Sequence, residues 1–159
     1  MESSSVGAAF DATNTSAKPP SSFAVLCIAV IGKNNNPLLV KSFSTRHQEL
    51  KFHYCCHTAC DIVEERVAPG SKNLDLYLGL LYCIEDLAVY GFMTNTKIKF
   101  IVVISMSDAA IKDIEMKNLF RRLHNQYIVL VNNPFYDVEA APKITSKKFL
   151  AAVDSMVLG

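Results

Sequence analysis

The clearest pattern in the chain lies in the segment 97–105. From Ile98 on, the odd-numbered and the even-numbered positions are both almost entirely apolar. A strand with this pattern is typically covered on both of its faces. The run over 23–31 has the same character, whereas the run over 38–43 carries polar Lys41 and suits an edge strand. We therefore expect the strands at 23–31 and 97–105 to lie in the middle of a sheet.

Two longer segments have apolar residues at the three- and four-residue spacings of an amphipathic helix. The first has Thr45 as its predicted N-cap and runs to about Val67. The second begins within 107–113 and ends before Pro134, because proline and the residue before it disfavour helical continuation. A further apolar stripe over 149–157 predicts a short terminal helix.

Two more strands lie between the predicted helices. Alternate leucines over 74–83 predict a strand with one strongly apolar face, and its mixed second face makes Tyr77 and Leu81 candidate surface anchors for a partner. The apolar run over 88–93 predicts the next strand, which a turn at 94–96 joins to the central one. The order is therefore ββαβββαα, an α/β (α+β) fold. We predict a five-stranded, antiparallel-rich sheet with spatial order 2-1-5-4-3, with one helix on one face and two on the other.

The domain organisation follows from length and local composition. The first 22 residues are rich in Ser, Ala, Thr and Pro and show no apolar period, so we predict a disordered tail over 1–22. The chain has 159 residues, which suffices for one sizeable core but hardly for two. We therefore predict a single domain over 23–159.

Composition excludes several classes of function. The formal net charge is +1, so no excess of basic charge attracts the chain to nucleic acid or to an acidic membrane. Hydrophobic residues make up 50% of the chain although no run is long enough to span a bilayer, which favours apolar surface kept for protein partners. The five cysteines show no disulfide spacing, which indicates a reducing compartment and a cytoplasmic protein.

One cluster on the first predicted helix has metal-ligand spacing. His53, Cys56, His57 and Cys60 follow each other at three- and four-residue steps, so a zinc site or an activated thiol is an alternative to a purely structural role. Cys56 and Cys60 belong to the apolar stripe of the helix, however, and no second cluster supplies further ligands. We therefore predict no catalytic residue, no metal and no cofactor.

Two further features bear on partners. Asp61, Glu64 and Glu65 lie on the outer side of the first helix, as an acidic ridge suited to a basic partner or simply as a solvated face. The Asn-Pro-x-Tyr sequence at 133–136 matches a turn motif recognised by phosphotyrosine-binding-type domains. The alternative, which we favour, is structural: Pro134 ends the helix and Phe135 packs back on the domain.

Five stretches in chain order resemble the sedlin family, whose fold is the longin fold, over about residues 23–157. They are LKFHY at 50–54, LYLGLLY at 76–82, TNTKIKF at 94–100, LFRRLHN at 119–125 and NPFY at 133–136.

The resemblance implies a non-enzymatic subunit of the TRAPP (trafficking protein particle) complexes, which tether vesicles and promote nucleotide exchange on Rab GTPases. Its expected partners are the small-subunit core and the larger, complex-specific subunits, with contact to a Rab only through them and no insertion into the membrane. Transport between endoplasmic reticulum and Golgi, and within the Golgi, is the implied setting, with the protein peripheral at those membranes. Asp61 matches a family aspartate tied to partner binding. The alternative is a longin-type regulatory or adaptor domain of another trafficking complex.

Overall fold

The computed structural model describes residues 24–45, 48–67, 76–105, 113–136 and 143–158. The predicted order ββαβββαα is confirmed; the predicted tail over 1–22 lies outside the described residues. The elements are β1 (Val25–Ile31), β2 (Pro37–Ser42), α1 (Glu49–Arg66), β3 (Tyr77–Ile84), β4 (Leu87–Met93), β5 (Lys99–Ser105), α2 (Asp113–Val131) and α3 (Lys147–Leu158).

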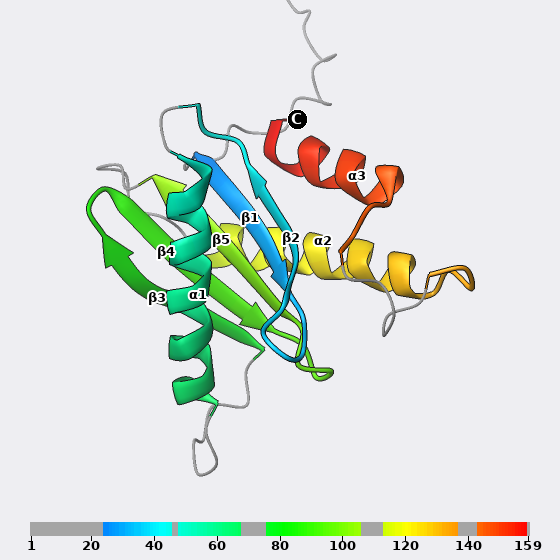
Figure 1. The fold of residues 1–159 in the computed structure, drawn as a ribbon, viewed down its shortest axis with the longest axis horizontal. Coiled ribbons are helices and arrows are strands. Elements are labelled where there is room, and N and C mark those ends of the chain that lie inside the picture. Colours follow the sequence, from blue (N-terminus) through cyan, green and yellow to red (C-terminus); the bar gives the residue numbers. More distant parts are fainter. Residues whose placement is uncertain (1–23, 46–47, 68–75, 106–112, 137–142, 159) are drawn as a thin grey trace, which may run out of the picture.

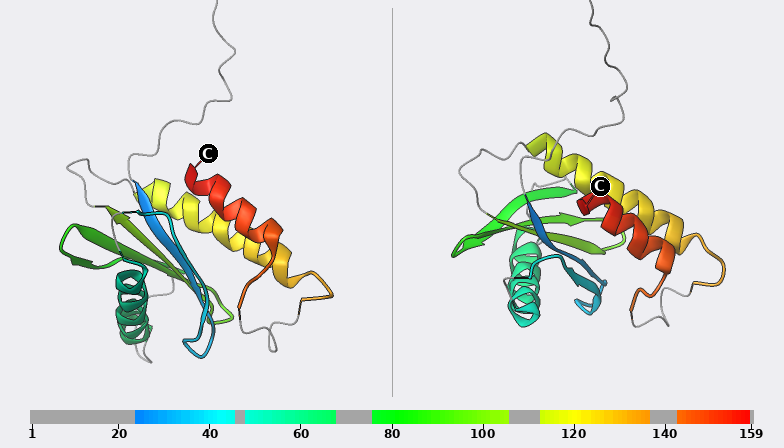
Figure 2. Two further views of the ribbon diagram at one scale, coloured as in Figure 1. Left: turned by 45° about the horizontal axis from the view of Figure 1, so that its top comes forward. Right: turned by 90° about the horizontal axis from the view of Figure 1, so that it is seen from above.

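The five strands form one antiparallel sheet in the order β2-β1-β5-β4-β3, as predicted. Helix α1 lies across one face of this sheet, and α2 and α3 lie together on the other (Figures 1 and 2). The predicted α+β architecture, with one helix on one face and two on the other, is therefore correct. It is the arrangement that a longin-like fold implies.

Because successive side chains of a strand point to opposite faces, each central strand contributes to two cores. On β1, Ile28 and Val30 pack on the side of α2 and α3, whereas Cys27, Ala29 and Ile31 pack on the side of α1. The same alternation continues in β5, whose Phe100, Val102 and Ile104 join the first core and whose Ile101 and Val103 join the second.

Hydrogen bonds that link Lys99, Asn35 and Glu64 connect the sheet, the β1–β2 turn and α1, and we call these three side chains the polar strap. The Lys99 side chain is buried at 4% exposure, and its Nζ donates a hydrogen bond of 2.6 Å to Asn35 Oδ1. Asn35 Nδ2 in turn donates to Glu64 Oε1 on α1. Asn35 has φ 62°, a left-handed conformation that asparagine adopts more readily than most residues, so the turn presents this side chain to both partners.

Two local predictions are wrong. Helix α1 begins at Glu49, and its N-cap is Gln48 with an extended backbone and no side-chain capping bond, so Thr45 does not cap it. Leu81 is buried at 7% exposure in the core beneath α1 and is not a surface anchor. The pairing of β3 with β4 shifts register between Tyr77 and Gly79 and again between Leu80 and Tyr82. These irregularities interrupt the two-residue alternation on which the Leu81 prediction depended.

Candidate functional site

The outer face of α1 combines exposed apolar side chains with exposed carboxylates. Leu50 and Tyr54, one turn apart near the start of the helix, are 75% and 62% exposed. Asp61, Glu64 and Glu65 are exposed toward its end, as the predicted acidic ridge requires. We call these five residues the α1 face.

The apolar end of the α1 face borders a shallow groove between the start of α1 and the β3–β4 turn. Leu50, Tyr54 and His57 line it from the helix, and Ile84 at the end of β3 and Glu85 in the turn line the other side. The Lys51 ammonium forms an ion pair with the Glu85 carboxylate across this groove. The hydrogen bond to Glu85 raises the pKa of Lys51. A mostly apolar groove with a charged rim is suited to an apolar side chain of another protein.

The acidic end of the α1 face is held in place by neighbouring elements. Glu64 accepts the bond from Asn35 in the β1–β2 turn. Two residues later, the Arg66 guanidinium donates hydrogen bonds of 2.8 and 2.9 Å to the backbone oxygens of Leu78 and Leu80 on β3. The end of α1 that carries Asp61 and Glu65 is therefore joined by hydrogen bonds to the β1–β2 turn and to β3.

The predicted partner-binding residues do not form one surface. Asp61, Glu64 and Glu65 share α1, but Tyr77 is half-buried on the opposite side of the sheet. There its ring packs against Phe120 with centroids 6.0 Å apart, and Lys117 Nζ lies 5.4 Å from its centroid. Tyr77 therefore belongs with α2.

Sequence reasoning missed the two apolar members of the α1 face, Leu50 and Tyr54. The signal was available, because both positions fall outside the apolar stripe that the helix turns to the sheet. An apolar residue outside that stripe has no place in the core and remains exposed.

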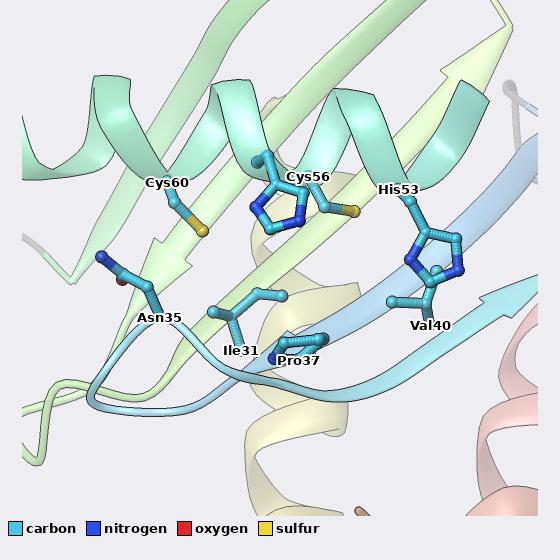
Figure 3. Close-up of a pocket in the computed structure, with 8 residues that line it drawn as sticks. Ile31, Asn35, Pro37, Val40, His53, Cys56 and Cys60 are labelled. Carbon is cyan, nitrogen blue, oxygen red and sulfur yellow. The ribbon is translucent and has the colours of Figure 1, made fainter. Parts of the chain in front are cut away.

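The His53–Cys60 cluster lines a small cleft between α1 and the β1–β2 hairpin (Figure 3). Cys60 lies beside Asn35 at one end of the cleft and His53 beside Val40 at the other. Burial raises the pKa of the Cys60 thiol to about 11, and a hydrogen bond with Cys27 together with burial raises the pKa of Cys56. Burial of these thiols therefore disfavours the thiolate form that acts as a nucleophile.

Within the described ranges, no group of three or more His, Cys, Asp or Glu side chains is arranged to hold a metal ion. None of the helices in the described part of the chain combines the length and apolar character needed to cross a membrane.

The chain is similar to known proteins over most of its length. The sequence profile of the Sedlin family matches residues 30–158. The chain is 45% identical over 137 residues to the trafficking protein particle complex subunit 2-like protein of Taeniopygia guttata, covering 84% of this chain and 96% of that protein. It is 47% identical over 139 residues to the protein of the same name from Dictyostelium discoideum, with the same coverage. The Bos taurus protein of that name is 44% identical over 137 residues.

Proposed function

The chain belongs to the Sedlin family, and on this premise we propose that it is a subunit of a trafficking protein particle complex. Its role is to bind other subunits and thereby assemble the complex, without carrying out catalysis itself. The observation that carries the proposal is the α1 face, which joins an apolar groove to an acidic ridge on one helix. The similarity to subunits of such a complex over 84% of the chain supports the same role.

The chemistry of the α1 face specifies its partner. Apolar side chains of the partner bury Leu50 and Tyr54, and basic side chains lie opposite Asp61 and Glu65. Burial of the two apolar side chains contributes most of the affinity, since large apolar groups dominate interface energetics. The carboxylates at the edge accelerate association and disfavour acidic partners.

The cellular setting is part of the proposal. The complex acts between endoplasmic reticulum and Golgi and within the Golgi, and the chain is peripheral at these membranes through its partner subunits. Nucleotide exchange on a Rab GTPase takes place on other subunits. The chain contributes by linking larger subunits to the small-subunit core.

The test is capture of a large complex subunit by the purified chain carrying Asp61→Tyr. Because Asp61 is exposed, the variant folds normally, which circular dichroism and thermal unfolding verify. We expect capture to fall by at least about tenfold, because a bulky ring replaces a charge within the contact. Asp61→Asn removes the charge alone and is expected to weaken capture less.

Asn125→Tyr is the matched control, because it places the same ring on the exposed side of α2, across the sheet from the α1 face. It is expected to leave capture unchanged. Equal capture by the parent chain and the Asp61→Tyr variant would refute the role of the α1 face. Loss of capture in the control as well would show that the assay does not report on α1.

A further inference from the structure

The Asn-Pro-Phe-Tyr sequence after α2 forms a well-defined turn. The Tyr136 backbone N–H donates to the Asn133 carbonyl oxygen at 3.0 Å, which closes a β-turn. Inside it, the Phe135 backbone N–H donates to Asn133 Oδ1, also at 3.0 Å, which is an Asx-turn. Pro134 occupies the second position, for which its fixed φ is suited. Each residue thus favours one conformation, and the turn exists before any partner binds.

The turn is attached to the domain at both of its ends. Before it, the last helical bonds run from Asn132 N–H to Ile128 O and from Asn133 N–H to Leu130 O, at 3.0 and 3.2 Å. At its other end, the half-buried Tyr136 packs against the core shared by α2 and α3. Figure 1 shows the end of α2 and this turn projecting from the side of the molecule, away from the sheet.

Phe135 does not pack back on the domain, contrary to the sequence prediction, because its side chain is 95% exposed. The turn borders a hollow between the end of α2 and the start of α3, lined by Val129, Asn133 and Lys148 among others. Val129 is itself 53% exposed. The exposed phenyl ring is suited to insertion into another protein, and Asn133 of the same turn borders the hollow that Val129 and Lys148 line.

We propose that the 133–136 turn is a second docking element, which inserts Phe135 into an apolar pocket of a small folded domain. That pocket accommodates one phenyl ring, has a hydrogen-bond acceptor for Asn133 Nδ2 and carries acidic side chains that face Lys148. This element lies on the α2 side of the sheet and does not depend on the α1 face.

Two alternative partners fit the structure less well. Domains that bind a motif by strand addition need an extended segment beside it, whereas the residues before Asn133 are helical and include buried Tyr127 and Leu130. A membrane surface accepts a phenyl ring in any orientation and so does not account for the two hydrogen bonds that fix the turn. Recognition of the turn itself requires both its geometry and its exposed ring.

The experiment measures binding of the full-length chain to purified EH domains, a class of small domain that binds Asn-Pro-Phe peptides. Isothermal titration calorimetry is expected to show saturable one-to-one binding. Phe135→Ala is expected to weaken it by at least about thirtyfold, the loss typical of a central interface side chain. Asn133→Ala removes the Asx bond and is expected to weaken binding by about fivefold. Ile114→Ala is the matched control, because it removes a 65% exposed apolar side chain from the opposite end of α2 and is expected to have no effect.

Four results would overturn the proposal. The first is that no EH domain binds the parent chain, and the second is that Phe135→Ala binds as tightly as the parent. The third is saturable binding to a strand-adding phosphotyrosine-binding domain in place of an EH domain. The fourth is Phe135-dependent sedimentation with phosphatidylcholine–phosphatidylserine vesicles when no domain binds. None of these results affects capture through α1, so this proposal and the proposed function fail separately.

Discussion

Removing the Asn35 side chain should loosen the strap that connects the sheet to α1. Lys99 is a charged residue buried at 4% exposure, and Asn35 Oδ1 accepts a hydrogen bond from its ammonium. Without that acceptor the buried ammonium loses a charged hydrogen bond, which costs about 2 kcal/mol of unfolding free energy. Because Asn35 has positive φ, alanine there adds roughly 1 kcal/mol of backbone strain that glycine avoids.

We therefore expect Asn35→Ala to lower the unfolding free energy by about 3 kcal/mol and Asn35→Gly by about 2 kcal/mol. The bond to Glu64 is solvent-exposed and adds little. Urea denaturation followed by circular dichroism at 25 °C measures both values. The difference between the alanine and glycine variants isolates the backbone contribution from the lost hydrogen bond.

A double-mutant cycle identifies Lys99 as the group that needs Asn35. In a Lys99→Met background no ammonium is left to satisfy, so Asn35→Gly should cost less than about 1 kcal/mol. The coupling energy between the two positions is then above about 1 kcal/mol. Equal losses from Asn35→Gly in both backgrounds would refute the strap as described, and so would an Asn35→Ala variant as stable as the parent.

Three further predictions concern the core, the thiols and an imidazole. Leu81→Ala should lower the unfolding free energy by about 3 kcal/mol, because its side chain fills the core beneath α1. Leu80 is 43% exposed, so Leu80→Ala should lower the unfolding free energy by less than about 1 kcal/mol. Equal losses of stability in Leu80→Ala and Leu81→Ala would contradict the burial of Leu81. Of the five thiols, exposed Cys83 alone should react promptly with Ellman's reagent in the native protein, since the other four are buried and burial raises the pKa of Cys60 to about 11. A prompt reaction that survives Cys83→Ser would contradict this. Burial lowers the pKa of His124 in the native protein. The unfolded chain therefore binds more protons than the native one near and below the usual histidine pKa, and the unfolding free energy falls as the pH drops through that range. The urea midpoint should therefore fall between about pH 7 and 5 in the parent chain, and it should fall less in His124→Phe. An equal fall in both proteins would contradict the reasoning.

The fold was predictable because its central strands have unambiguous patterns. In β1 and β5 both alternating sets of residues are apolar, which places these strands side by side in the middle of the sheet. From there the connection lengths determine the strand order and the faces that the helices cover. Lys99 was not predictable as a buried residue, because its acceptor comes from a turn far away in the sequence.

The failures at Leu81 and Phe135 share one physical cause, which is local geometry that a regular period does not encode. Gly79 in β3 has φ 76°, and the register shifts beside it turn Leu81 into the core. Phe135 is exposed because Asn133 closes a turn on itself, which directs the ring away from the domain. Of the α1 face, Asp61, Glu64 and Glu65 followed from helical spacing, whereas Leu50 and Tyr54 required attention to apolar residues outside the stripe.

The central claim is that this chain works as a bound subunit and not alone. Affinity purification of the tagged full-length chain from its own cells, followed by quantitative mass spectrometry, tests this most directly. We predict that the subunits of a trafficking protein particle complex purify with it in near-equal amounts, and that Asp61→Tyr depletes the larger ones. Recovery of the chain without those subunits would contradict the account.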